Sequence, residues 1–400
     1  MPPLAAGLET VPGPVANGVT RAAEHGSLLV GTVMPLAAGR GGAEQMFLDL
    51  CRHRAHTRAA WRVAFLDDGD LVEAVRDLGV PTRVIPRGHL RQPHRYAATV
   101  AALAGWIRAE RLDAVVSWMP LAHLYTGPAA LATLGPGRAV WFQHGLVRLP
   151  APTLLDRVAA ALPAREVWCP SRHTAAAQRR AAPHRQVRVV YPSVDLARFD
   201  PGRLPRPAGA RRVLGLPVDG PLVGMVTRLA PWKGCDTFVA ATPRILGRIP
   251  SARFVVVGGT HVSAPEYPAA LRAQAEALGV GERLVLAGHQ TNVPLWMQAM
   301  DVVVHASRGE PFGMTVVEGM ALGKPVVAAA SGGPLESVRD GIDGRLVPPG
   351  NPEGLAEAVC AYLARPDEAA AFGRLARQRA RAFSAGAMAT VVGDSLRSLF

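Results

Sequence analysis

The alternation of strands and helices is the feature that most limits how this chain can fold. From residue 28 onward, short valine-rich runs of strand length alternate with longer stretches of helical character. Strands separated by helices form βαβ units, in which the strands are parallel and helices cover both faces of the sheet. The pattern therefore predicts a doubly wound α/β domain over residues 27–200. Its expected strands are Leu28–Val33, Arg62–Leu66, Thr82–Ile85, Asp113–Ser117, Ala139–Phe142, Glu166–Cys169 and Val187–Val190.

A second series of the same kind follows an interruption of the apolar pattern. Residues 201–220 are rich in proline, glycine and arginine, as expected of a linker between domains. We predict a second doubly wound domain over residues 221–380, because a chain of 400 residues fits two domains of roughly 200 residues each. Its expected strands are Leu222–Thr227, Phe254–Gly258, Leu284–Ala287, Asp301–His305 and Pro325–Ala329.

The predicted fold is therefore α/β, with two Rossmann-like domains that face a central cleft. Ligands of open parallel sheets bind outside the carboxyl ends of the strands, so residues just after strands should be the most informative. We also predict the conformation of the two ends of the chain. Residues 1–26, which are rich in proline and glycine, are expected to be mobile, and residues 381–400 are expected to form a helix that packs back on the N-terminal domain.

The composition fits a cytoplasmic protein and argues against several other classes. The net charge of +13 could indicate an anionic partner, but Lys233 and Lys324 are the only lysines among 44 basic residues. Such arginine bias is more typical of a GC-rich coding sequence than of a binding surface, and the sequence lacks nucleic-acid-binding motifs. It also lacks an apolar run of membrane-spanning length and a signal-peptide pattern, although peripheral contact with the inner membrane face is left open. Four distant cysteines without CxxC spacing indicate neither a disulfide framework nor a zinc site.

One segment, HASRGEPFGMTVVEGMALGKPVVAAASGGPLE from His305 to Glu336, carries most of the chemical information. Pro311 and Gly313 disfavour a continuous helix, whereas Met314–Leu322 has good helical character. The backbone N–H groups of residues 313–315 should therefore lie at a helix N-terminus without intrahelical partners. Such a terminus is suited to binding a diphosphate.

Two glutamates flank this predicted helix start. Glu310 precedes the turn and Glu318 lies one turn inside the helix. Because a bend separates them, the two carboxylates can contact different parts of one extended ligand. Carboxylates accept paired hydrogen bonds from vicinal hydroxyls, which favours a ligand that contains a sugar or a ribose.

The pair Glu310-x7-Glu318, followed by GMALGKPVVA and GGPLE, resembles the signature of the retaining glycosyltransferases of family 4, which have the GT-B fold. The resemblance covers most of residues 28–365. Its other matching stretches are GRGGAE (Gly39–Glu44), YPSVDLARF (Tyr191–Phe199), VTRLAPWKG (Val226–Gly234) and VVVGG (Val255–Gly259). The chain departs from the family where PNGVD is replaced by Pro192-Ser193-Val194-Asp195, and Pro231-Trp232 precede Lys233.

The resemblance implies a role for each matching residue. Glu310 would hold hydroxyls of the donor sugar near the reacting carbon, and Glu318 would bind the ribose. Arg228 and Lys233 would hold the diphosphate, and His144 would face the donor sugar at the reacting centre. Further donor contacts are implied for Gly42, Phe312, Gly313, Met314 and Thr315. The turn Gly288–Thr291 either contacts the base or is a plain turn.

The implied reaction is metal-independent transfer of a sugar from a nucleoside diphosphate to an acceptor hydroxyl, with retention of configuration and no cofactor. The acceptor class is left open between a small molecule, a glycan and a lipid-linked compound, as is the oligomeric state. A non-catalytic sugar-nucleotide-binding protein of the same fold is the main alternative, and a sugar-nucleotide epimerase or a phosphorylase is a second one.

The remaining polar motifs have weaker interpretations. Asp67-Asp68-Gly69-Asp70 is predicted to be a solvated turn rather than a metal site. His123 and the basic stretch Arg87–Arg95 could line an acceptor pocket or contact anionic lipid, but a solvated loop is favoured. We expect Lys324 at the surface. His289 and His305 are expected to be structural rather than catalytic.

Overall fold

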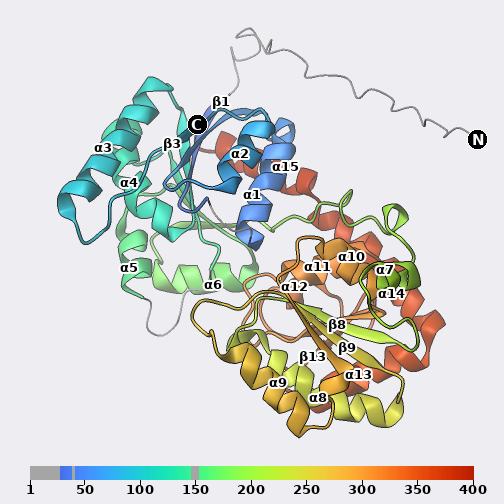
Figure 1. Ribbon diagram of the computed structural model, residues 1–400. Helices are drawn as coiled ribbons and strands as arrows, with labels where there is room; N and C mark the ends of the chain where they lie inside the picture. Colours follow the sequence, from blue (N-terminus) through green and yellow to red (C-terminus); the bar gives the residue numbers. More distant parts are fainter. Residues whose placement is uncertain (1–27, 38–40, 146–152) are drawn as a thin grey trace, which may run out of the picture.

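The computed structural model describes residues 28–37, 41–145 and 153–400, and these residues form two domains with parallel sheets (Figure 1). The N-terminal segment 1–26, expected to be mobile, lies outside the described residues. The N-terminal sheet has the strand order β3-β2-β1-β4-β5-β6-β7. Its strands are β1 Leu28–Met34, β2 Ala59–Phe65, β3 Thr82–Val84, β4 Ala114–Trp118, β5 Ala139–Phe142, β6 Glu166–Cys169 and β7 Gln186–Val189.

Helices cover both faces of the N-terminal sheet because its strands are apolar on both sides. Val30 and Val63 belong to a core beneath α1 and α2, whereas Val33 and Val115 belong to a core beneath α3 and α4. The helices of this domain are α1 Gly42–Arg52, α2 Asp70–Asp77, α3 Pro93–Ala109, α4 Pro120–Leu134, α5 Leu154–Ala161 and α6 Arg172–Ala181.

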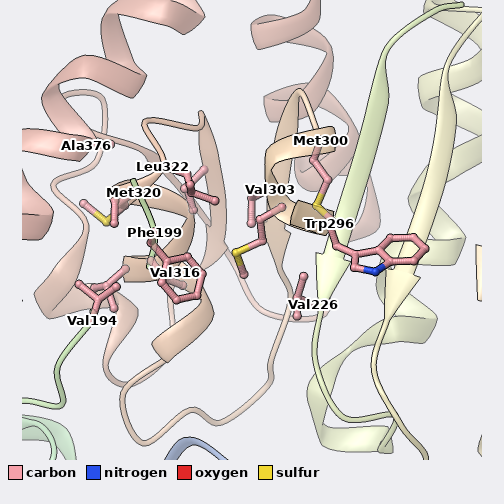
Figure 2. Packing of buried hydrophobic residues seen from close by; sticks show 14 of the residues in the cluster. Val194, Phe199, Val226, Trp296, Met300, Val303, Val316, Met320, Leu322 and Ala376 are labelled. Carbon is pink, nitrogen blue, oxygen red and sulfur yellow. The ribbon is translucent and has the colours of Figure 1, made fainter. Parts of the chain in front are cut away.

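The C-terminal domain repeats this architecture with the strand order β10-β9-β8-β11-β12-β13. Its strands are β8 Leu222–Val226, β9 Arg253–Val257, β10 Leu284–Gly288, β11 Val302–His305, β12 Val326–Ala329 and β13 Arg345–Val347. Its helices are α7 Pro207–Val213, α8 Cys235–Arg248, α9 Tyr267–Ala277, α10 Val293–Ala299, α11 Met314–Ala321, α12 Pro334–Ser337, α13 Pro352–Ala364 and α14 Pro366–Ala380. Figure 2 shows one of its two cores, in which Val303 of β11 packs near Val316 and Met320 of α11.

The structure confirms the predicted fold class. Every predicted strand is present, and no strand end differs from the prediction by more than three residues. The short edge strand β13 was not predicted. It contributes only Arg345–Val347 and carries an arginine, so it lacks the apolar run by which the other strands were recognised.

The segment predicted as a linker, residues 201–220, packs with the C-terminal domain, and the chain already contacts that domain before it. Val194 and Phe199 already pack in the core with α11 (Figure 2). Helix α7 lies within the predicted linker, and its Arg211 is 5% exposed. That side chain donates hydrogen bonds to the carbonyl oxygens of Ala299 and Gly220, both at 2.8 Å, and pairs with Asp301.

The chain returns to the N-terminal domain at its end. Helix α15 (Ala385–Arg397) lies beside α1 (Figure 1), and its Met388 and Val392 are buried in the same core as β1 and β2. Ser395 Oγ donates a hydrogen bond to Glu166 Oε2 at 2.5 Å and accepts one from Trp168 Nε1 at 2.8 Å. The two domains are thus connected by two crossings of the chain.

Candidate functional site

The predicted site segments follow the strands at which each sheet reverses its direction of growth. In the N-terminal sheet this point lies between β1 and β4, and in the C-terminal sheet between β8 and β11. Open α/β sheets bind ligands at this point, beyond the carboxyl ends of the strands. Gly42 follows β1, Arg228 and Lys233 follow β8, and Glu310 follows β11. The topology therefore brings residues from distant parts of the sequence to one region.

A tight turn before α8 positions Lys233. Pro231–Lys233 form a single 3-10 turn, and Gly234 follows with φ of +73°. A Cβ at Gly234 would lie 2.0 Å from the carbonyl oxygen of Ala306, so the close approach of the two loops requires glycine. Arg308 fixes the same turn, since its backbone N–H and guanidinium donate to the carbonyl oxygens of Trp232 and Pro231 at 2.8 and 2.7 Å.

Lys233 and Glu310 form an ion pair where these loops meet. Lys233 Nζ lies 2.7 Å from Glu310 Oε2, and His305 Nε2 lies 3.1 Å from the same oxygen. Glu310 is only 7% exposed. Burial by itself would raise the pKa of Glu310, but the charge of Lys233 and the hydrogen bond from His305 outweigh burial and hold that pKa well below its usual range. Glu310 is therefore a charged acceptor at neutral pH.

Helix α11 begins beside this carboxylate, as predicted. Its N-cap is Gly313 with φ of +89°, and the N–H groups of Gly313, Met314 and Thr315 donate no hydrogen bond to the residues that the structure describes. The Gly332-Gly333 turn supports the loop from below, because Gly333 N donates to Glu310 O at 3.0 Å. A helix start with free N–H groups therefore lies beside a fixed cation, an arrangement suited to an anionic ligand.

Phe312 does not fit its predicted donor contact through its side chain. Its ring is 3% exposed and packs in the C-terminal core. The ring centroids of Tyr191 and Phe383 lie 5.9 and 5.5 Å away. The apolar ring gains more from burial between these aromatic neighbours than it could at a polar ligand, so any donor contact of Phe312 is through its backbone.

Glu318 lies where α11 meets the N-terminal domain. A Cβ added to Gly42 would lie 3.3 Å from Met314 Cγ, which places the start of α1 against the start of α11. Glu318 is 9% exposed. Burial is the main cause that raises the pKa of Glu318; the charge of Arg198 lowers it in part, Asp49 of α1 raises it slightly, and the resulting pKa is about 7.

Arg198 connects the elements around Glu318. It lies in the first crossing between the domains, and its guanidinium donates to Gln45 Oε1 of α1 at 3.2 Å and to the carbonyl oxygen of Thr291 at 3.4 Å. The turn Gly288–Thr291, for which base contact and a plain turn were both left open, is thereby tied to the same region. Arg228, in contrast, is exposed and makes no ion pair or hydrogen bond with other described residues.

His144 occupies a different environment from the donor-side residues. It follows β5, stacks on Phe142 with ring centroids 4.1 Å apart, and lies 4.9 Å from the Trp118 ring. Burial lowers the pKa of His144 to about 3, so the imidazole is neutral at physiological pH. Its Nε2 has no hydrogen-bond partner among the described residues. The residues that follow, 146–152, lie outside the described part of the chain.

Two sequence interpretations were wrong because the side chains are buried by distant segments. Lys324 was expected at the surface but is 7% exposed, with Nζ donating to the carbonyl oxygen of Gln298 at 2.7 Å at the end of α10. His123 was grouped with a solvated loop but is fully buried in α4, bonded to Ser117 Oγ at 3.1 Å and stacked on Trp141. The stretch Arg87–Arg95 is largely exposed, as favoured, and Asp67 and Asp68 lie in an exposed turn.

Glu336 is a residue whose part in this region the sequence did not reveal. It is the last residue of GGPLE, and its carboxylate accepts hydrogen bonds from the backbone N–H groups of Arg172 and His173 at 2.9 and 3.0 Å. Tyr191 OH donates to it at 2.9 Å. A residue of the C-terminal domain therefore caps helix α6 of the N-terminal domain. A signal was present, since a carboxylate stabilises a helix N-terminus, but the partner helix lies more than 160 residues away.

The described residues contain neither a cluster suited to a metal ion nor a helix that could span a membrane. Within residues 28–37, 41–145 and 153–400, no three His, Cys, Asp or Glu side chains gather as they would around a metal ion. None of the helices in these ranges combines the length and apolar character needed to cross a bilayer.

Two facing Rossmann-like domains with a site at their switch points define the GT-B class of fold. The sequence matches the family Glycosyltransferase Family 4 over residues 40–198 and the family Glycosyl transferases group 1 over residues 209–379. The chain belongs to the GT-B glycosyltransferases of the family 4 type.

Named relatives agree with this family. The chain is 36% identical over 215 residues to D-inositol 3-phosphate glycosyltransferase 2 of Catenulispora acidiphila, a match that covers 52% of this chain and 50% of the relative. It is 40% identical over 203 residues to the D-inositol 3-phosphate glycosyltransferase of Mycobacterium leprae, covering 50% and 46% of the two chains. The chain therefore spans about half the length of these relatives.

A solved structure extends the likeness to both domains. HepE of Anabaena, in complex with UDP-glucose, superposes with a TM-score of 0.81 at 25% identity, over 93% of this chain and 100% of HepE. The fold predicted from the sequence is therefore that of a known GT-B protein.

Proposed function

We propose that this chain is a retaining, metal-independent glycosyltransferase that moves a sugar from a nucleoside diphosphate to an acceptor hydroxyl. The observation that carries the proposal is the convergence of Lys233, Glu310 and the α11 N-terminus at the switch point of the C-terminal sheet. A cation and free backbone N–H groups suit a diphosphate, and a charged, buried carboxylate beside them suits sugar hydroxyls.

In this proposal, the diphosphate is held by the side chains of Arg228 and Lys233 and by the backbone of residues 313–315. Negative charge develops on the departing diphosphate as the bond from the sugar C1 to the phosphate oxygen breaks. Fixed positive groups stabilise this charge more in the transition state than in the ground state. Lys233 is held in place by its ion pair with Glu310, so little reorganisation is needed when the charge develops.

Glu310 would accept hydrogen bonds from the donor sugar, and Glu318 from the ribose. The acceptor oxygen then forms a bond to C1 on the face from which the diphosphate leaves, and its proton passes to an oxygen of the leaving diphosphate. The products are the glycosylated acceptor and the nucleoside diphosphate. His144, neutral at physiological pH, would contact the donor sugar from the N-terminal domain.

UDP-glucose is the first donor to test, because HepE was solved with it. The phosphorylated inositol in the names of the relatives makes a polar cyclic alcohol a natural first acceptor to test. Peripheral contact with a membrane and a role in glycan or natural-product biosynthesis remain parts of the proposal.

The test is an incubation of the purified chain with UDP-, GDP- and dTDP-sugars, with and without acceptor alcohols, in buffer that contains EDTA. We expect release of the nucleoside diphosphate and, with the right acceptor, a product whose anomeric configuration by NMR equals that of the donor. Loss of activity in EDTA would contradict metal independence, and an inverted product would contradict retention. Tight donor binding without any transfer or hydrolysis would instead favour the non-catalytic alternative.

A further inference from the structure

His305 has no part in the proposed reaction, yet it contacts the carboxylate on which that reaction depends. It is the last residue of β11 and is 3% exposed. Its Nε2 lies 3.1 Å from Glu310 Oε2. The sequence alone favoured a purely structural histidine.

We propose that His305 is a positioning residue for Glu310: it holds the carboxylate so that the second oxygen, Oε1, faces the donor sugar. This inference rests on the proposed function, since it assigns a task within the same site. His305 itself does not touch the donor.

The hydrogen bonds around Glu310 support this division of its two oxygens. Lys233 and His305 both approach Oε2, whereas Oε1 accepts no hydrogen bond from the described residues. The two donors come from different elements, the turn after β8 and the end of β11, so together they fix the carboxylate in direction as well as in place. A carboxylate as buried as Glu310 needs such donors, because an unpaired buried charge is costly.

Lys233 alone cannot fill this role during the reaction. In the proposed function its ammonium also contacts the diphosphate, where negative charge grows as the leaving group departs. The positive charge of Lys233 is then shared between two anionic groups, so Lys233 alone does not fix the direction of the Glu310 carboxylate. In the proposed function His305 contacts no phosphate group, and its side chain is short and rigid. It therefore keeps its hydrogen bond to Glu310 throughout the reaction.

The surroundings of His305 indicate that the Nε2 edge is the part of the ring with a polar task. Ser307 Oγ lies 3.2 Å from Nε2, and Ser307 is fully buried. The other ring nitrogen, Nδ1, is buried and has no hydrogen-bond partner among the described residues. Packing alone does not explain a histidine here, because an apolar side chain of similar size would fill the same space without burying an unpaired nitrogen.

The first experiment separates binding of the sugar from binding of the nucleotide. His305→Leu removes the hydrogen-bond donor to Glu310, whereas His305→Gln places an amide N–H near the position of Nε2. The control, His184→Leu, changes an exposed histidine in the loop after α6. By calorimetry, we expect His305→Leu to weaken binding of UDP-glucose by about tenfold to a hundredfold. Binding of UDP should change less than about threefold, since Glu310 contacts the sugar and not the nucleotide. His305→Gln should recover most of the affinity, and His184→Leu should match the wild type.

A second experiment requires no donor and so separates this inference from the proposed function. It is a double-mutant cycle in chemical unfolding with His305→Leu, Glu310→Gln and the double variant at pH 7. If His305 supports the Glu310 carboxylate, His305→Leu should clearly lower the denaturant concentration at the unfolding midpoint in the wild-type background. In the Glu310→Gln background the same substitution should lower that midpoint by less than half as much. The same cycle with His184→Leu should be additive.

The two experiments have distinct outcomes. Equal loss of UDP and UDP-glucose binding in His305→Leu, no recovery in His305→Gln, or an additive cycle would each overturn the positioning role. A coupled cycle in a chain that binds no sugar nucleotide would preserve the link between His305 and Glu310 but remove the proposed function.

Discussion

The two domains hold their predicted site residues in different ways, the proposed donor side on the C-terminal domain and the proposed acceptor side on the N-terminal domain. On the C-terminal domain, Glu310 is fixed by Lys233 and His305 through short hydrogen bonds, and glycines hold the surrounding loops in close contact. On the N-terminal domain, His144 is fixed by stacking on Phe142 and by the nearby Trp118, and its Nε2 has no partner among the described residues. Charged groups thus organise one side and aromatic packing the other.

This difference indicates how the two sides can vary. A diphosphate and a sugar demand fixed charges and hydrogen-bonding groups, and such a set tolerates little change. Around His144, the described residues offer aromatic contacts rather than a charged network, which places weaker demands on the residues there. Met119 has φ of +76°, an uncommon conformation for a residue other than glycine, at the end of β4.

The largest effect is expected from removing the charged pair of the donor side. Lys233→Ala and Glu310→Gln should each reduce turnover by about 10²- to 10³-fold, because each removes a group fixed beside the developing charge or the reacting sugar. Steady-state release of nucleoside diphosphate measures the effect. Glu353→Gln, an exposed change on α13, is the matched control. Near-normal turnover in both site variants would remove the basis for the donor-side assignment.

The next largest effect is on stability, and it comes from the charge of Glu318, so its size depends on pH in a defined direction. Its pKa is raised in the folded protein to about 7, above the ordinary value of 4.5, so the folded state binds the proton more tightly than the unfolded state. Stability from this group is therefore full below pH 4.5 and is lost as pH rises through 7. Glu318→Gln should be more stable than the wild type at pH 8, by up to about 3 kcal/mol, and nearly equal at pH 4.

Urea unfolding at these two pH values measures this difference. A gain of the same size at both pH values would show that the effect comes from packing rather than from the charge. In the proposed function the same protonation weakens ribose binding, so the affinity of the wild type for UDP should fall as pH drops from 8 to 6. The affinity of Glu318→Gln for UDP should change less over that range.

On the acceptor side, His144→Ala should lower turnover by about 10- to 100-fold, the effect of one hydrogen bond to a group that becomes charged. Binding of UDP should stay within about twofold of the wild type, because the nucleotide lies on the other domain. Because the pKa of His144 is about 3, its protonation should contribute no limb to the pH profile of turnover between pH 5 and 9. Weaker UDP binding in His144→Ala would contradict the separation of the two sides.

The smallest effect should come from the contact that joins the two sides. Glu336→Gln replaces the carboxylate that caps α6 and accepts from Tyr191 OH. Loss of charge at a helix N-terminus should lower the free energy of unfolding by about 1–2 kcal/mol. Glu353→Gln again serves as the control. If the stability of the Glu336 variant were unchanged, the bonds from Glu336 to α6 would contribute nothing to the contact between the domains.

The sequence by itself determined the class of fold and the position of the loop and helix on which the proposed donor site rests. Strand-length apolar runs recur because a sheet covered on both faces requires them, and this requirement is local enough to be read along the chain. The loop from Glu310 to Gly313 and the helix after it were also predictable, since proline, glycine and helix propensity act over a few residues. The resemblance to family 4 rested on these same local patterns.

Only the tertiary structure decided which side chains face one another across long distances in the sequence. Lys324 is buried against α10, Phe312 packs between Tyr191 and Phe383, and Glu336 caps a helix of the other domain. The predicted linker became part of the C-terminal domain for the same reason, because α7 and Arg211 found partners near β11. Periodicity reports whether a residue lies on an apolar or polar face of its own element. The neighbours that bury the residue or form an ion pair with it depend on tertiary packing, which joins residues far apart in the chain.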